Sequence, residues 1–377
     1  MSEHPELPVP APAPADPRAV QRFVDHALER ALELGRELPA PGEGATRELW
    51  GELTALGRTD LAHARIIEPH LDALAILRQA GRTDLITGHD TWGVWAAEGP
   101  GEPLRATPSS AAQPTDDDAD DARDCAGSMP VDQDGRQWTL TGTKPWCSLA
   151  GSVTRAVVTA HVTDEAGKPT GHRRAFVVAT DHPGFQPEAA AGWTSHGLAE
   201  VVTVPVRFEG VPAQPLGADE WYLTRPGFAW GGMGVAAVWL GGAQSVADLL
   251  WRKLVRPARP VDDAARTALG QLDLTLGAAH AVLDRAAAAV DRGEATGEHG
   301  AAWALRVRRT VADAADTVIR VVSRATGPGP LTGDPAHVRR VESLQVYIRQ
   351  DHAERDTAAL GRALLELARE GSEETPW

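Results

Sequence analysis

The chain has 377 residues, 42% of them apolar, and a formal net charge of −15 at pH 7. This length fits two or three packed subdomains, and the acidic balance argues against a nucleic-acid partner. Its two cysteines, Cys125 and Cys147, exclude a disulfide framework and a metal cluster of cysteines. No run of about 18 apolar residues indicates a membrane span. Because the N-terminal residues also lack the pattern of a signal peptide, we expect a cytoplasmic protein.

The N-terminal part of the chain is predicted to be helical. Residues 1–15 are rich in Pro and Ala, which predicts a disordered tail. Apolar residues then recur at helical spacing, and they predict helices over 17–38, 45–56 and 60–80. Pro69 is expected to kink or split the third of these helices. We therefore assign residues 16–88 to an N-terminal helical domain.

Strand-like segments follow in the middle of the chain, separated by turns rich in Gly, Pro and Asp. The predicted strands are 92–96, 137–141, 155–161, 174–180 and 201–208. The acidic run 114–124 between two of them is interpreted as a solvated loop. These residues, 89–218, predict a β-barrel-like domain.

The last part of the chain is again helical. Four segments have the length and periodicity of long helices, namely 228–250, 264–292, 298–325 and 338–368. They predict an antiparallel four-helix bundle over residues 219–372. The fold class is therefore α+β, mainly α. The Ala/Leu faces of the last three helices exceed the needs of one bundle core, which predicts a homodimer or homotetramer.

The most informative segment for chemistry is WTLTGTKPWCSLA, residues 138–150. Its Trp146 is suited to lie against a flat heteroaromatic ring, and Ser148 to hydrogen-bond a ring nitrogen. The alternative is a buried tryptophan and a capping serine at the end of a strand. The sequence has no G-x-G-x-x-G motif, P-loop, H-E-x-x-H or G-x-S-x-G. A nucleotide cofactor must therefore be held in some other way.

This segment resembles the signature of the acyl-CoA dehydrogenases, Gly-x-Lys-x-Trp-Ile-Thr/Ser, with Gly142, Lys144, Trp146 and Ser148 at the matching positions. Four further segments resemble family motifs in the same order along the chain: Trp95–Pro100, Asp181–Leu198, Val206–Gly217 and Thr326–Pro330. The resemblance extends over roughly residues 60–365. No single motif is specific, but five motifs in the family's order are.

The resemblance implies that FAD binds between a helical N-domain, a β-domain and a C-terminal bundle. It assigns Trp146 and Ser148 to the isoalloxazine ring, and Trp95 and Ala97 to the loop along the ring's pyrimidine side. The family's glycine turn, here Gly327 and Gly329, is implied to approach the cofactor closely. Arg256 is implied to belong to the family's Arg-x-x-Phe-Gly run, which contacts the FAD phosphates from the neighbouring subunit, and Gln271 to match the glutamine that follows this run in the family. The altered run is Arg252–Pro260, which keeps the cations of the family's Arg-x-x-Phe-Gly motif but lacks Phe-Gly.

The family's catalytic glutamate has no counterpart here. The run that follows the glycine turn places Gln350, Asp351 or His352 at its position, and 228–233, where some relatives carry the base, contains no acid. Asp351 and His352 are therefore the candidate acid–base residues. On one continuous helix Tyr347, Asp351 and Glu354 share a face, and His352 points about 100° away from Asp351. The alternative is an exposed helical ladder of charges.

Three functions follow from this resemblance. The first is FAD-dependent α,β-dehydrogenation of an acyl thioester such as an acyl-CoA, or of a related small substrate. The second is a monooxygenase of the same fold that uses reduced flavin and oxygen on a small molecule. The third is a non-catalytic scaffold that has lost its flavin. No metal, nucleic acid or membrane is expected to take part.

Overall fold

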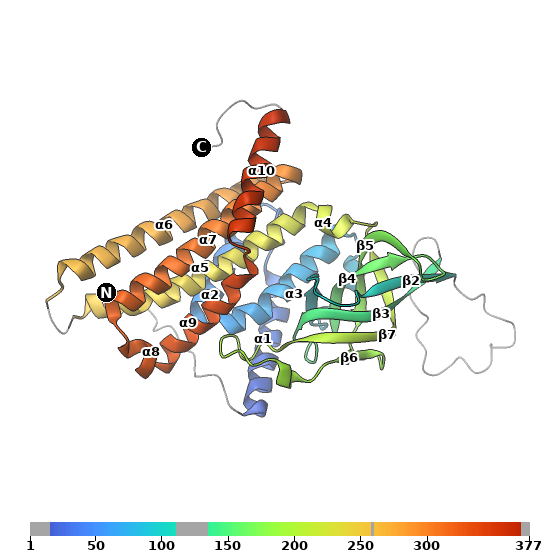
Figure 1. Ribbon diagram of the computed structural model, residues 1–377, viewed down its shortest axis with the longest axis horizontal. Coiled ribbons are helices and arrows are strands. Elements are labelled where there is room, and N and C mark those ends of the chain that lie inside the picture. Colours follow the sequence, from blue (N-terminus) through green and yellow to red (C-terminus); the bar gives the residue numbers. More distant parts are fainter. Residues whose placement is uncertain (1–15, 111–134, 258–259, 371–377) are drawn as a thin grey trace. The chain divides into compact units, whose positions relative to one another are not determined.

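The computed structural model describes residues 16–110, 135–257 and 260–370. The predicted tail 1–15 and the acidic run 114–124 lie outside these residues. The described chain divides into two compact units (Figure 1). Unit 1 contains the residues up to Leu71, the segment Thr194–Val201 and the residues from Pro226 onward. Unit 2 contains Asp72–Trp193 and Val202–Arg225.

The three predicted N-terminal helices are present as α1 (Pro17–Glu37), α2 (Thr46–Thr59) and α3 (Leu61–Gln79). Asp16 caps α1 by accepting a hydrogen bond from the backbone N–H of Arg18 at 3.0 Å. Pro69 lies inside α3, which nevertheless remains a single helix. The helices up to residue 71 belong to the same unit as the C-terminal helices.

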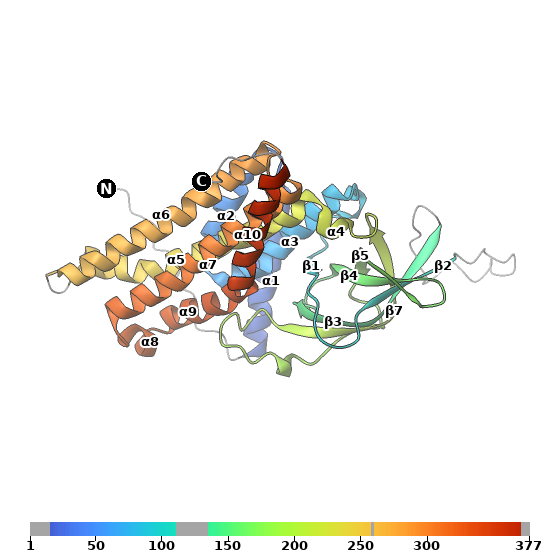
Figure 2. The same cartoon turned by 45° about the horizontal axis from the view of Figure 1, so that its top comes forward.

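The C-terminal part of unit 1 contains long helices that run side by side (Figure 1). They are α5 (Pro226–Val255), α6 (Asp263–Asp291) and α7 (Gly297–Thr326), followed by α8 (Gly329–Gly333), α9 (Pro335–Tyr347) and α10 (Glu354–Glu370). Helix α10 packs on α7 (Figure 2). Helix α5 also packs on α2 with backbone close to backbone, since a Cβ atom on Gly241 would lie 2.0 Å from the carbonyl oxygen of Thr54.

By length and apolar composition α5 could cross a membrane, the one helix among the described residues that could do so. However, 83% of its most apolar window is buried inside the structure. This burial is what the core helix of a helical unit shows. The apolar character of α5 is therefore explained by its packing against α2, α6 and α7.

The prediction of one continuous helix over 338–368 is wrong. Helix α9 ends at Tyr347, a 3-10 turn covers Ile348–Gln350, and α10 begins at Glu354. Asp351 has extended backbone angles (φ −85°, ψ 139°), and Ala353 has a left-handed φ of 50°. The carboxylate of Asp351 accepts a hydrogen bond from the backbone N–H of Ala353 at 2.9 Å. This local bond competes with the helical pattern and favours the break.

Unit 2 consists of β-strands and short helices. The strands are β1 (Trp92–Trp95), β2 (Arg105–Ser110), β3 (Arg136–Ser148), β4 (Arg155–Thr163), β5 (Pro169–Ala179), β6 (Phe185–Pro187) and β7 (Thr203–Leu216). The short helices are η1 (Thr83–Leu85), η3 (Ala190–Gly192) and α4 (Trp221–Thr224). Successive strand pairs β2–β3, β3–β7, β7–β5, β5–β4 and β4–β2 return to their starting strand. Strands β2 and β6 were not predicted.

Candidate functional site

Strand β3 is irregular where the signature residues lie. Its pairing with β7 shifts register between Lys144 and Cys147, which marks a bulge at Pro145 and Trp146. Trp146 has a φ of 58°, which is uncommon for a residue with a bulky side chain, and it is 59% exposed. Among the described residues of unit 2 it is the only large apolar side chain that is more than a third exposed. The alternative of a buried strand-end tryptophan is therefore wrong.

Bulges and strained backbone occur where a strand must direct one side chain out of the regular pleat. Here the bulge presents the indole of Trp146 at the surface of unit 2, two residues before Ser148. Gly142, earlier in the same strand, has a φ of 121°, and a Cβ atom there would lie 2.7 Å from the carbonyl oxygen of Pro103. Only glycine fits that position, which explains the first residue of the motif.

Ser148 ends β3, and its hydroxyl lies 2.9 Å from the hydroxyl of Thr203 at the start of β7. Either oxygen can donate in this pair. Thr203 was not identified from the sequence. Its proximity to Ser148 depends on the pairing of β3 with β7.

Trp95 and Ser148 are brought together, but not in the predicted way. The indole N–H of Trp95 donates to the backbone carbonyl of Ser148 at 3.1 Å, and its ring stacks on Phe185. Trp95 is 2% exposed, so its side chain supports the end of β3 from the core of unit 2. Ala97, two residues later, is exposed in the loop after β1 and remains a candidate contact residue.

Lys144 belongs to the signature motif, but no role was predicted for it from the sequence, and the structure makes it a functional candidate. It is 1% exposed, and its ammonium donates to Glu98 at 3.1 Å and to Thr159 at 2.9 Å. Burial lowers the pKa of Lys144, while the Glu98 carboxylate opposes this shift. His161 lies 3.6 Å from the other oxygen of Glu98. Lys144 thus links the bulged strand to the loop that contains Ala97.

Cys147 faces away from this surface. It is fully buried, and its thiol donates to the carbonyl oxygen of Lys144 at 3.3 Å. Burial raises the pKa of the thiol to about 12. The thiolate is therefore not populated near neutral pH, and Cys147 behaves as a small buried hydrophobe.

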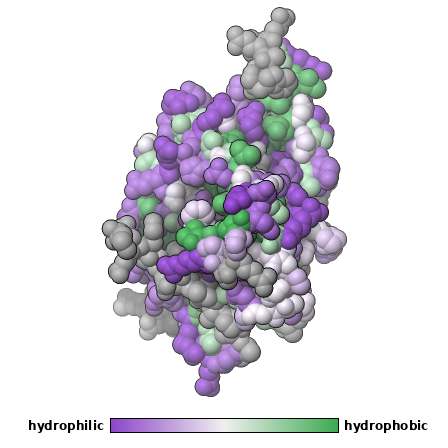
Figure 3. Space-filling view, turned by 90° about the vertical axis from the view of Figure 1, so that its left-hand side faces the viewer, coloured by the Kyte–Doolittle hydropathy of each residue, from purple (hydrophilic) through white to green (hydrophobic). Residues whose placement is uncertain are grey.

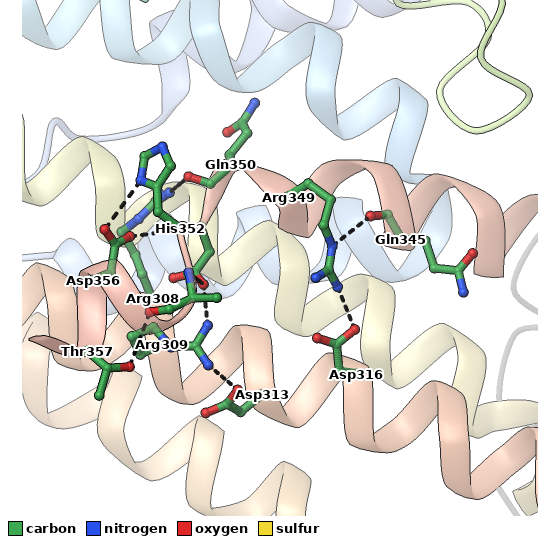
Figure 4. Close-up of polar contacts among 12 residues, drawn as sticks. Arg308, Arg309, Asp313, Asp316, Gln345, Arg349, Gln350, His352, Asp356 and Thr357 are labelled. Carbon is green, nitrogen blue, oxygen red and sulfur yellow. Dashed lines mark hydrogen bonds and ion pairs between the residues drawn. The ribbon is translucent and has the colours of Figure 1, made fainter.

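Unit 1 holds the candidate acid–base residues Asp351 and His352 in the break between α9 and α10. Figure 4 shows His352 beside Asp356. The carboxylate of Asp351 forms an ion pair with Arg309 on α7, and Arg309 also binds Asp313. The side chain of Asp351 is 3% exposed, and its second oxygen has no hydrogen-bond partner. Asp351 is thus a buried, paired carboxylate and not part of an exposed helical ladder.

His352 has a different environment. Its side chain is 54% exposed, its backbone N–H donates to Asp356 at 3.0 Å, and its Nδ1 lies 3.3 Å from the same carboxylate. Tyr347, before the break, is 1% exposed and packs edge-on against Trp239. Burial, together with the Glu68 carboxylate, raises the pKa of Tyr347, which therefore stays a neutral phenol.

The remaining predicted cofactor residues also belong to unit 1. Arg256 and Gln271 are exposed, on either side of the connection between α5 and α6. Gly327 caps the C-terminal end of α7 with a φ of 68°. This left-handed backbone conformation favours glycine and explains why the position is a glycine. Gly329 begins α8. A Cβ atom on either glycine would meet open space, so no part of the described chain approaches them closely.

The comparisons with known proteins give a fold. No protein-family model matches the sequence, and a search of curated proteins finds no match. Solved structures do match. Glutaryl-CoA dehydrogenase from Mycobacterium smegmatis has a TM-score of 0.69 at 18% identity, and the match covers 96% of this chain and 97% of that one.

Two structures with bound FMN are similarly close. KijD3 in complex with FMN and a dTDP-linked amino keto sugar has a TM-score of 0.68 at 20% identity, over 96% of this chain and 97% of that one. TdsC from Paenibacillus sp. A11-2, a dibenzothiophene monooxygenase, was solved with FMN and indole. In that complex it has a TM-score of 0.65 at 15% identity, over 93% of this chain and 98% of that one. The chain therefore shares its fold with an acyl-CoA dehydrogenase and with FMN-bound proteins that include a monooxygenase.

Proposed function

We propose that the chain is a flavin-dependent oxidoreductase whose flavin ring lies against Trp146 and Ser148. The observation that carries this proposal is the exposed indole of Trp146, held in a left-handed conformation at the bulge of β3. The two FMN-bound structures of the same fold support it. When bound, a flavin supplies electron transfer that amino-acid side chains do not perform.

The residues around Trp146 fit such a ring. Its indole offers a flat apolar face, and the paired hydroxyls of Ser148, two residues further along the strand, and Thr203 are polar groups of the kind that contact a ring nitrogen or oxygen. Lys144 and Glu98 hold the loop of Ala97 beside the strand. Together these groups bind and orient the ring, but they do not determine which reaction the flavin performs.

Of the two reactions, the monooxygenase is favoured. α,β-Dehydrogenation needs a carboxylate that is free to remove a proton from the substrate. Asp351 is paired with Arg309, and residues 228–233 contain no acid. We therefore infer a reaction of reduced flavin with oxygen on a small molecule, and dehydrogenation of an acyl thioester is the alternative. Asp351 and His352 remain acid–base candidates that mutagenesis will test.

We propose FAD as the flavin because Arg256 and Gln271 keep polar groups at the positions that the family resemblance assigns to its ADP half. FMN is the alternative, supported by KijD3 and TdsC. We also propose a cytoplasmic homodimer or homotetramer. Figure 3 shows apolar side chains gathered among hydrophilic ones on one face. Among the described residues of unit 1, the exposed large apolar side chains are Phe228, Trp251, Val255, Leu274, Leu331 and Leu365.

Titration of the purified protein with FMN and with FAD tests the flavin proposal, with Ser148→Ala and Thr203→Val as variants. Loss of the hydrogen bond should weaken binding by about 1 kcal/mol and shift the flavin absorbance spectrum. If the protein binds neither flavin, and neither flavin changes its unfolding temperature, the result supports the alternative of a non-catalytic scaffold that has lost its flavin. Anaerobic bleaching by an acyl-CoA identifies the dehydrogenase, whereas oxygen-dependent product from chemically reduced flavin identifies the monooxygenase.

A further inference from the structure

The loop that follows β1, residues 96–100, packs against the bulge of β3. A Cβ atom on Gly99 would lie 2.9 Å from Cγ of Pro145 and 3.8 Å from the indole nitrogen of Trp146. Because a proline ring is rigid, a side chain on Gly99 would push the loop away from the strand. The loop is therefore a direct neighbour of Trp146 within unit 2, and Gly99 is the residue that lets it approach.

Two buried side chains, Lys144 and Thr159, hold this loop in place. Lys144 is 1% exposed, and its ammonium donates to the carboxylate of Glu98 at 3.1 Å and to the hydroxyl of Thr159 at 2.9 Å. Thr159 lies on β4, and its hydroxyl donates in turn to the backbone carbonyl of Ala96 at 3.4 Å. The loop is thus attached at Ala96 and at Glu98, and Gly99 follows the second attachment directly.

The attachment at Glu98 is the stronger of the two, because it joins opposite charges at hydrogen-bond distance. The other carboxylate oxygen of Glu98 lies 3.6 Å from Nε2 of His161 on β4. Glu98 therefore connects the loop to both β3 and β4. Loss of its charge would release the residue that precedes Gly99.

Trp146 needs support from its neighbours because its conformation is unfavourable by itself. A left-handed φ of 58° disfavours any residue with a side chain, and the indole, 59% exposed, gains little from burial. Such conformations persist where the surrounding structure fixes them. The contact of Gly99 with Pro145 is a constraint of this kind, since it lies beside the indole nitrogen of Trp146.

We propose that Glu98 is a positioning residue for the flavin of the proposed function, on which this inference rests. Through its ion pair with Lys144, Glu98 keeps Gly99 against Pro145. The loop then fixes the indole of Trp146 in the orientation that receives the ring. Flavin affinity therefore depends on a carboxylate that acts through Trp146.

Flavin titration of Gly99→Ala and Glu98→Gln tests this inference. The added methyl group of Gly99→Ala displaces the loop but keeps the ion pair, whereas Glu98→Gln removes the charge but keeps the shape of the side chain. Each should weaken flavin binding by up to about tenfold, the loss expected for a misplaced stacking partner. In the Trp146→Gly background neither change should weaken binding further, because the effect passes through the indole. The matched control is Gly151→Ala, since a Cβ atom there meets open space in the turn after β3.

Fluorine NMR of the flavin-free protein, labelled with fluorotryptophan, gives a readout that does not depend on the cofactor. The signal of Trp146 is identified by its absence from Trp146→Phe. Gly99→Ala and Glu98→Gln should both shift this signal, and Gly151→Ala should not. If Glu98→Gln does not fold, Gly99→Ala decides, because it retains the ion pair.

Three results overturn the inference: a Trp146 signal that neither variant moves, flavin affinity that neither variant changes, or losses of affinity that add to that of Trp146→Gly. The last result is the one expected if Glu98 only stabilises the fold. A wild type that binds neither FMN nor FAD overturns the proposed function, and the role of Glu98 with it. Flavin binding together with an unmoved Trp146 signal overturns the role of Glu98 alone.

Discussion

The ammonium of Lys144 lies 3.1 Å from the carboxylate of Glu98, and the two side chains differ sharply in exposure, at 1% and 38%. Lys144 is the buried partner of this ion pair, and Glu98 is the partly exposed one. Removing either residue breaks the same pair, but only loss of Glu98 leaves a buried charge without its counterion. The two single variants should therefore differ in stability.

We expect Glu98→Ala to lower the free energy of unfolding by about 2 kcal/mol, because the Lys144 ammonium stays buried. Lys144→Met should cost about 1 kcal/mol, through loss of its hydrogen bonds to Glu98 and Thr159. Urea unfolding of both variants measures the difference. The reverse order, with Lys144→Met the less stable variant, would show that the cost of a buried ammonium without its counterion does not decide these stabilities.

Trp146 should show a conflict between stability and function. Replacing it by glycine relieves the left-handed backbone and should raise the stability of the flavin-free protein by about 1 kcal/mol. The same change removes the ring's stacking partner, so flavin affinity should fall by about tenfold. Thermal unfolding and flavin titration of Trp146→Gly measure both effects. A less stable variant with unchanged flavin affinity would place the flavin elsewhere.

Asp351→Asn separates a structural carboxylate from a catalytic one. Because Asp351 is buried and paired with Arg309, the variant should unfold with about 1–3 kcal/mol less free energy. A catalytic base would instead lose about 100-fold in turnover with unchanged stability. Arg309→Gln is the control, since it removes the same ion pair and keeps the carboxylate. Equal destabilisation by both variants, with turnover retained, assigns Asp351 to the fold.

Protonation of a buried histidine should lower the free energy of unfolding in mild acid. His70 on α3 is 2% exposed, and burial, with a smaller effect of Arg36, lowers its pKa to about 4. The unfolded chain binds the proton near pH 6.5, so stability should fall as pH drops from about 6.5 to 4, by on the order of 3 kcal/mol. His70→Gln should flatten this dependence in urea unfolding, whereas replacing the exposed His172 should not. An unchanged slope would contradict the depressed pKa.

The apolar side chains exposed on unit 1 predict self-association. Light scattering at micromolar concentration should give a dimer or tetramer, and Leu274→Glu should shift it toward the monomer. Leu274 is 75% exposed on α6. A monomeric wild type would show that these residues serve another purpose.

Prediction from the sequence was accurate where a pattern is local. Helical periodicity predicted α1 to α7 closely, apart from the short α4. The strand predicted over 137–141 instead continues through the bulge to Ser148. Prediction failed for elements that form through contacts between residues far apart in the sequence. Strands β2 and β6 are short, and they exist through pairing with β3 and β7. Asp351, in the break after Tyr347, pairs with Arg309, which lies 42 residues away in sequence.

The division of the chain has a consequence for its synthesis. Unit 2 is an almost continuous stretch, whereas unit 1 is assembled from residues on both sides of it. Helix α2 needs the close backbone contact of Gly241, which is translated roughly 180 residues later. Since domains fold as they emerge, unit 2 can complete its sheet while α2 still awaits α5. The face of α2 that packs on α5 therefore stays unburied for a long time, and the ribosome-bound chain is where chaperones would matter most.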